Sequence, residues 1–173
     1  MKKFFLMLCI ALLCITAAEA QTPYTSNEDG GHPGGTILKG VISKYILQND
    51  PSFNWYASNQ KLYKPDIAVL NAMAAAKNKF QFVVFGGTWC EDTQFILPKF
   101  FKLQEQAGVA DKDISFFGVN REKQTLGNVA AAFKIINVPT IIVMKDGKEI
   151  GRVVEYGKTG KWDKELADIM QAF

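Results

Sequence analysis

The spacing of apolar positions in the first half of the chain is typical of helices. Apolar residues recur at helical intervals over residues 37–46 and again over 67–78, where Pro65 and Asp66 supply a helix start. Between these segments, aromatic residues gather within 53–63. Aromatic side chains placed between two helices usually pack onto the domain, although they could also line a binding groove.

From residue 80 onward, short apolar runs alternate with helical patterns. The expected elements are, in chain order, a strand at 80–85, a helix at 90–106, a strand at 114–119, a short helix at 129–133, strands at 140–144 and 149–154, and a final amphipathic helix from Trp162. The Asp146-Gly147 pair between the last two strands favours a hairpin. This order predicts an α/β fold with one mixed sheet flanked by helices and an N-terminal helical extension.

The first twenty residues have the pattern of a secretory signal. Lys2 and Lys3 precede an apolar run over residues 4–15, and small residues follow up to Ala20, where we expect cleavage. The run is shorter than the roughly 20 residues that a membrane-spanning helix needs. We therefore expect residues 1–20 to be a signal peptide, the protein to be periplasmic or secreted, and no membrane anchor to remain.

Composition divides the rest of the chain into three regions. Residues 21–36 are polar and rich in Gly and Pro, which favours a flexible linker, and His32 is interpreted as a solvated residue within it. Residues 37–79 are the helical extension, and 80–173 are the main domain. With 20 basic and 17 acidic residues, the formal net charge of +3 gives no electrostatic case for nucleic acid. No spacing of Cys, His and acidic residues fits a metal site, and no cofactor motif is found.

The cysteines are distributed so that a single thiol remains after signal cleavage. Cys9 and Cys14 lie within the predicted signal, which leaves Cys90 alone in the mature chain. No intramolecular disulfide can then form. A lone thiol in an exported protein is either buried and inert or available for intermolecular chemistry. We expect a monomer, and an exposed Cys90 would also permit a disulfide-linked dimer.

Cys90 follows a buried strand and a Gly86-Gly87 turn, and it opens a helix. This position places its sulfur near free backbone N–H groups at the positive end of the helix dipole. Thr93, three residues on, is expected to turn its hydroxyl toward the sulfur. Trp89 is expected to flank the site as a partly exposed aromatic residue.

Two cationic residues follow the strand at 114–119. Arg121 and Lys123 could lie at the same carboxyl edge of the sheet as Cys90, where α/β folds place their sites. The simpler interpretation is that both are solvated surface charges.

These motifs, taken in order, resemble the thioredoxin superfamily. The Trp-Cys segment at Cys90, Pro98 eight residues later, and Val138-Pro139-Thr140 before the last strand pair all agree with it over residues 80–173. The Gly-Gly-Thr-Trp-Cys-x-Asp-Thr string is similar to that of secreted thioredoxin-like proteins of Bacteroidetes. The resemblance implies a thioredoxin-like fold. It also implies a cis-proline loop at Val138, Pro139 and Thr140 that binds an extended substrate segment beside Cys90 and Trp89.

Two departures from the family pattern limit the chemistry. Thr93 replaces the second cysteine of Cys-x-x-Cys, and Val84 occupies the position of a buried carboxylate. A chain without a resolving thiol cannot complete a dithiol–disulfide cycle alone. We therefore expect monothiol exchange with a protein or small thiol or disulfide partner, with Cys90 as nucleophile and Thr93 as its hydrogen-bond partner.

Two alternatives to monothiol exchange stay open. The first is a redox-inactive module that binds a peptide or protein in the groove beside Pro139, with Cys90 incidental. The second is a thiol peroxidase in which Cys90 is oxidised to a sulfenic acid. It is the less favoured, because the further Gln and Trp-Asn motifs of glutathione peroxidases have no match in this sequence.

Overall fold

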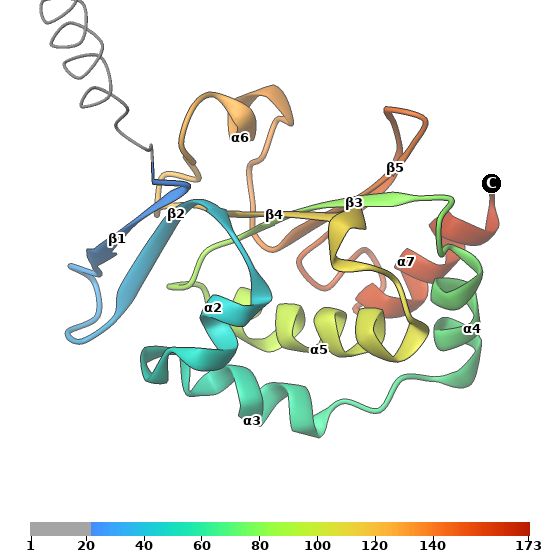
Figure 1. The fold of residues 1–173 in the computed structure, drawn as a ribbon, viewed down its shortest axis with the longest axis horizontal. Coiled ribbons are helices and arrows are strands. Elements are labelled where there is room, and N and C mark those ends of the chain that lie inside the picture. Colours follow the sequence, from blue (N-terminus) through green and yellow to red (C-terminus); the bar gives the residue numbers. More distant parts are fainter. Residues whose placement is uncertain (1–21) are drawn as a thin grey trace, which may run out of the picture.

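A six-stranded mixed sheet runs through residues 22–173, the part of the chain that the computed structural model describes (Figure 1). The strand order is β1-β2-β4-β3-β5-β6; β3 and β4 are parallel, and all other neighbours are antiparallel. The strands are β1 (Tyr24–Glu28), β2 (Thr36–Ile42), β3 (Gln81–Gly86), β4 (Ile114–Gly118), β5 (Thr140–Lys145) and β6 (Lys148–Val154). The predicted signal peptide lies outside the described residues.

Helices cover the two faces of the sheet unequally. The longest helix, α5, lies below the sheet in Figure 1 with α3 outside it, whereas the short α6 lies above. The helices are α2 (Lys44–Asn49), α3 (Trp55–Leu62), α4 (Ile67–Ala75), α5 (Glu91–Ala107), α6 (Val129–Ala132) and α7 (Trp162–Gln171), with 3₁₀ turns at Pro51–Phe53 and Asp111–Asp113. Within the described range, none of the helices is long and apolar enough to cross a membrane.

The core is divided by the sheet into a large cluster and a small one. The large cluster fills the space between the sheet and α3, α4, α5 and α7. The small cluster, on the α6 face, is built around Phe85, Val119 and Val138, and Trp89 and Cys90 pack against it. The candidate cysteine thus lies at the edge of a packed hydrophobic cluster, which fixes its surroundings.

The structure corrects the predicted helix at residues 37–46. Thr36–Ile42 form the strand β2, which pairs with β1 and β4, and the helix begins only at Lys44. The apolar positions fit either spacing, so pairing with β4 decides the outcome. Gly40 has φ of 129°, and a Cβ there would come within 2.4 Å of the Pro23 carbonyl oxygen, a close approach that suits a strand in this hairpin.

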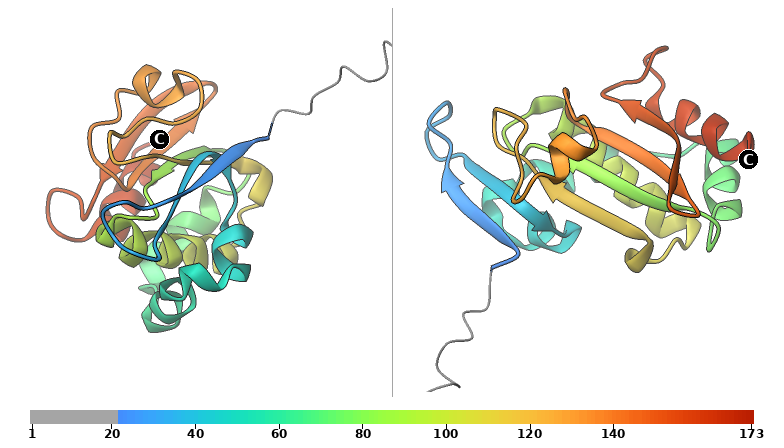
Figure 2. Two further views of the ribbon diagram at one scale, coloured as in Figure 1. Left: turned by 90° about the vertical axis from the view of Figure 1, so that its left-hand side faces the viewer. Right: turned by 90° about the horizontal axis from the view of Figure 1, so that it is seen from above.

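The segment predicted as a flexible linker also contains a strand. Tyr24–Glu28 form β1, which pairs antiparallel with Thr36–Gly40 and makes one edge of the sheet (Figure 2). Its side chains are mostly exposed, so the sequence has no alternating apolar pattern that would predict a strand here. Its strand conformation comes from backbone pairing with β2.

The helix α3 (Trp55–Leu62) lies where the sequence analysis expects only an aromatic cluster between helices, and the remaining elements agree with the sequence. Asp66 caps α4 by accepting a 2.7 Å hydrogen bond from the Ala68 N–H, and every element predicted from residue 80 onward is present. The aromatic cluster packs as expected, with Phe53 and Tyr56 buried. The α/β fold class is therefore confirmed as a thioredoxin-like mixed sheet flanked by helices.

Candidate active site

Cys90 stands at the junction of the central strand β3 and the helix α5. It is the N-cap residue of α5, with φ of −95° and ψ of 123°, and its N–H donates to the Gly87 carbonyl at 2.9 Å. It is partly exposed, and it is the free cysteine of the described residues. The first turn of a helix leaves backbone N–H groups unpaired, so its positive end stabilises negative charge on a nearby sulfur.

The loop before β5 faces the sulfur. The Cys90 thiol donates to the Val138 carbonyl, with 3.2 Å between Sγ and the oxygen, and the Val138–Pro139 peptide bond is cis. Thr140 begins β5 and donates its hydroxyl to the Asn137 carbonyl at 2.7 Å. The side chains of Val138 and Thr140 are buried, so this loop can offer a partner mainly its backbone.

The structure gives Thr93 a different hydrogen-bond partner from the predicted one. Its side chain is buried, and its hydroxyl oxygen accepts from the Gly87 N–H at 3.2 Å. In the described part of the chain, the hydroxyl makes no hydrogen bond with Cys90. Thr93 therefore fixes the turn that carries Cys90 and does not contact the sulfur through its hydroxyl.

The two glycines of the turn leave space for their neighbours. A Cβ on Gly86 would lie 2.6 Å from Leu97 Cδ1, and one on Gly87 would lie 2.6 Å from the Trp89 ring. Neither residue has a positive φ. The turn thus requires glycine because the core and the indole occupy the space that a side chain would take.

Trp89 is folded back over the turn and held there. Its Nε1–H donates to the Val119 carbonyl at 3.0 Å. Arg121 Cζ lies 5.1 Å and Lys123 Nζ 5.4 Å from the ring centroid, which are distances typical of cation–π contacts. Both cations therefore share the edge of the sheet with Cys90, the alternative that the sequence analysis favoured less.

Arg121 is partly exposed, with 39% of its side chain accessible, and it is paired with a buried carboxylate. Its Nε and Nη2 donate to the two oxygens of Asp29, at 2.9 and 2.8 Å, and the Asp29 side chain is 2% exposed. These hydrogen bonds hold the pKa of Asp29 below its ordinary value. Asp29 lies between β1 and β2, so sequence reasoning had no local signal for its part in the site.

Thr88 is a second residue whose role the sequence did not indicate. Its buried hydroxyl donates to the Thr36 carbonyl at 2.6 Å and accepts from the Leu38 N–H at 3.2 Å. Its own carbonyl accepts from Gln94 Nε2 at 2.8 Å. The residue joins the active-site turn to β2 on one side and to α5 on the other.

The opposite side of Cys90 is acidic and aromatic. Phe95 and Tyr156, both exposed, pack with their ring centroids 5.9 Å apart. Burial raises the pKa of Tyr156, and the neighbouring charges of Asp92, Cys90 and Glu91 raise it further. The pair is exposed to solvent, and Lys99 Nζ lies 2.7 Å from the centroid of the Phe95 ring.

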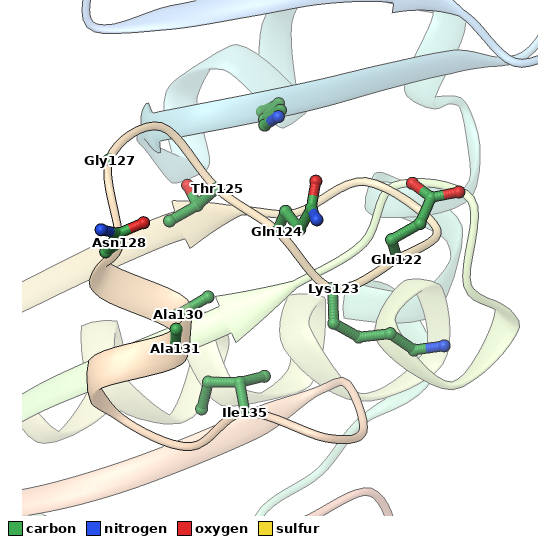
Figure 3. Close-up of a pocket in the computed structure, with 10 residues that line it drawn as sticks. Glu122, Lys123, Gln124, Thr125, Gly127, Asn128, Ala130, Ala131 and Ile135 are labelled. Carbon is green, nitrogen blue, oxygen red and sulfur yellow. The ribbon is translucent and has the colours of Figure 1, made fainter.

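A polar cavity of about 470 Å³ adjoins the site on its cationic side. Figure 3 shows Glu122, Lys123 and Gln124 on the loop after β4, with Ala131 of α6 and Ile135 of the following segment across from them. The cavity does not include Cys90, although Ile135 packs against the same small cluster as Cys90. Among residues 22–173, no group of His, Cys, Asp and Glu side chains could hold a metal ion.

Known proteins are similar to parts of this chain. The family model "Thioredoxin" matches residues 66–171. A thioredoxin-like protein of Acanthamoeba polyphaga mimivirus is 34% identical over 76 residues, which cover 44% of this chain and 53% of that protein. Thioredoxin-1 of Saccharomyces cerevisiae is 35% identical over 81 residues, which cover 47% of this chain and 73% of that protein. The chain thus matches about half the length of the first relative and about three quarters of the second.

A solved structure agrees at the level of the fold. A Pseudomonas aeruginosa protein of unknown function superimposes with a TM-score of 0.53 at 15% identity, covering 75% of this chain and 90% of that one. At this identity, the likeness concerns the fold alone. The family model matches more than half of the residues, including the Cys90 turn, the Val138-Pro139 loop and α7. The chain therefore belongs to the thioredoxin family.

Proposed function

We propose that this chain carries out monothiol thiol–disulfide exchange through Cys90 as an exported protein. The observation that carries the proposal is the placement of Cys90. It is partly exposed at the start of the 17-residue helix α5, with its sulfur 3.2 Å from the Val138 carbonyl oxygen. Its thioredoxin relatives support thiol–disulfide chemistry as the general activity.

The exchange is balanced without any further oxidant or reductant. The Cys90 thiolate attacks one sulfur of a partner disulfide, the partner's S–S bond breaks, and the departing thiolate takes up a proton. Cys90 is then joined to the partner in a mixed disulfide. A second thiol, from the same partner or a small molecule, attacks the partner's sulfur in that bond and releases Cys90.

The thiol that resolves the Cys90 mixed disulfide must come from another molecule. Thr93 stands where a resolving thiol would be needed, and its buried hydroxyl is bonded to the Gly87 N–H. A hydroxyl at that position offers no sulfur for a second disulfide. A mixed disulfide with Cys90 should therefore persist until an external thiol reaches it.

The partner is expected to contact the acidic and aromatic side of the site. Phe95 and Tyr156 are exposed there, while Trp89 on the other side is held by Val119, Arg121 and Lys123. An exposed aromatic pair offers a partner apolar area at low entropic cost. We propose a protein or peptide disulfide with an apolar residue near its cysteine as the preferred partner.

The test uses the purified protein with Cys9→Ser and Cys14→Ser, so that Cys90 is the only thiol. Incubation with a peptide disulfide should give a Cys90 mixed disulfide detectable by mass spectrometry, and Cys90→Ser should give none. Thr93→Cys should shorten the life of that species by supplying a resolving thiol. A native Cys90 that does not react with the peptide disulfide while the peptide still binds would instead establish the binding module.

A further inference from the structure

Part of the candidate site lies outside the residues that the family model matches. The family model begins at residue 66, yet β2 is hydrogen-bonded to Thr88 of the Cys90 turn, and Asp29 in the β1–β2 turn is paired with Arg121 beside Trp89. Figure 1 shows the β1–β2 turn on the same side of the molecule as the turn from β3 to α5. The hairpin, defined here as residues 24–42, is therefore a candidate for a role beyond closing the edge of the sheet.

The first contact joins the hairpin to Thr88. The Thr88 hydroxyl makes two hydrogen bonds with the backbone of β2, one to Thr36 and one from Leu38. Thr88 lies two residues before Cys90, and its side chain is 5% exposed. One of these bonds is buried and the other partly buried, so together they hold β2 against the Cys90 turn.

The second contact reaches Trp89 through Arg121. The two oxygens of Asp29 each accept one hydrogen bond from Arg121, and Asp29 Oδ1 also accepts from the Gly31 N–H at 3.0 Å. A Cβ on Gly31 would lie 2.7 Å from Arg121 Nη2, so the hairpin backbone lies directly against the guanidinium. Two parallel hydrogen bonds to a carboxylate fix both the plane and the position of the guanidinium, whereas a single ion-pair contact would not.

The guanidinium in turn lies against the indole next to the cysteine. Arg121 Cζ is 5.1 Å from the Trp89 ring centroid, the indole N–H is tied to the Val119 carbonyl, and Gly87 leaves room for the ring. The indole therefore has its nitrogen held by Val119, directly after β4, and its ring contacted by Arg121. Rotation of the ring would break the hydrogen bond to Val119 and give up the contact with Arg121.

We infer that Asp29 and Arg121 are positioning residues that hold Trp89 against the Cys90 turn, so that the N-terminal hairpin completes the active site. They act through Trp89 and do not contact the sulfur. Their role in exchange rests on the proposed function of Cys90. The positioning of Trp89 itself can be measured without exchange.

The test compares Asp29→Asn with Glu149→Gln in the same Cys9→Ser, Cys14→Ser background. Glu149 and Arg152 form a similar two-bond pair, but Glu149 pairs with Met144 near the β5–β6 turn, at the opposite end of β5 from Pro139. The amide of Asp29→Asn is neutral and has a single oxygen acceptor, so it cannot replace the two carboxylate oxygens that accept from Arg121. Three quantities are measured, namely acrylamide quenching of Trp89, alkylation of Cys90 by iodoacetamide, and exchange with a peptide disulfide. The Trp89 component of quenching is the difference from the Trp89→Phe protein.

Asp29→Asn should raise the Trp89 quenching constant and change the two Cys90 rates in opposite directions. Alkylation by the small reagent should rise several-fold as the indole loosens, while peptide exchange should fall by about tenfold because the turn is less well placed. Glu149→Gln should leave all three quantities at wild-type values. Equal behaviour of the two variants would overturn the inference.

A second variant covers the case in which Asp29→Asn does not fold. Arg121→Lys keeps the charge but cannot form the two-bond fork to Asp29, so it should show the same changes at smaller size. If wild-type Cys90 performs no exchange, the proposed function fails, yet quenching and alkylation still decide the positioning role. Wild-type quenching in a folded Arg121→Lys protein would refute that role.

Discussion

The two sides of Cys90 differ in how firmly they are held. On one side, Trp89 is fixed by the Val119 carbonyl and Arg121, and Arg121 is fixed by the buried Asp29. On the other side, Phe95 and Tyr156 make an exposed aromatic contact. A site that must position its nucleophile and also bind a partner needs one firmly held side and one exposed side. The first side is suited to positioning, and the second to recognition.

The sides also differ in charge. Lys123 lies over the indole and lines the cavity next to it, whereas Glu91 and Asp92 follow Cys90 in the first turn of α5. The fixed side is therefore cationic, whereas the open side carries both anions and the Lys99 ammonium, which lies over the Phe95 ring.

The largest expected effect is a loss of stability when β2 of the hairpin is pushed away from β4. In Gly118→Ala, the new Cβ would lie 2.4 Å from the Leu38 carbonyl oxygen, which is backbone and cannot rotate away. We expect a loss of about 2–4 kcal/mol in the free energy of unfolding, together with increased quenching of Trp89. Chemical denaturation measures the loss. Gly30→Ala, in the hairpin turn with no atom within 4 Å of its Cβ, is the control and should change stability by less than about 0.5 kcal/mol.

A somewhat smaller effect is expected from the Thr88 hydroxyl. Thr88→Val keeps the shape but leaves the Leu38 N–H and the Thr36 carbonyl without their partner. We expect about 1–3 kcal/mol of destabilisation and faster alkylation of Cys90, since a buried unpaired polar group is costly. Thr25→Val, at an exposed position on β1, is the matched control. An unchanged alkylation rate in a destabilised Thr88→Val protein would mean that the hairpin supports the fold and not the cysteine.

The contrast between the halves of the chain explains what the sequence could predict. From residue 80 onward, buried strands, the Asp146-Gly147 turn and the amphipathic α7 are local patterns, and the structure contains them all. Residues 37–46 have apolar positions that suit both a helix and a strand, and only pairing with β4 selects the strand. The polar strand β1 has no apolar signal because its side chains face solvent.

The same reasoning applies to the site. Cys90, Pro139 and Trp89 lie in motifs that can be recognised locally, and the structure brings them together. The Asp29–Arg121 pair joins residues 92 positions apart, and Thr88 reaches a β2 residue 50 positions away, so neither contact leaves a local pattern. The turn offers the Thr93 hydroxyl either the sulfur or the Gly87 N–H, and a local motif does not show that the hydroxyl accepts from the backbone group.

The open side of the site should affect partner choice more than stability. Tyr156→Leu removes one ring of the aromatic pair, whereas Tyr156→Phe keeps it. We expect Tyr156→Leu to slow exchange with an apolar peptide disulfide by about fivefold, which corresponds to about 1 kcal/mol, and to leave exchange with a small disulfide unchanged. Tyr156→Phe should resemble the wild type. Equal slowing with both disulfides would place the effect on Cys90 and not on partner recognition.

The smallest effect is a pH dependence on the fixed side. Because Arg121 lowers the pKa of Asp29 in the folded state, the charged carboxylate stabilises the fold above the ordinary value of about 3.9, and this stabilisation is lost as the pH falls through the folded pKa. The difference in unfolding free energy between the wild type and Asp29→Asn should therefore be constant above about pH 5 and shrink below about pH 4. Over the same acid range, Trp89 quenching should rise in the wild type and in Glu149→Gln, and stay constant in Asp29→Asn. Glu149 also has a lowered pKa through Arg152, so its stability difference should shrink in acid as well, but without any change at Trp89. An acid-induced rise in quenching that persists in Asp29→Asn would show that another carboxyl group controls the indole.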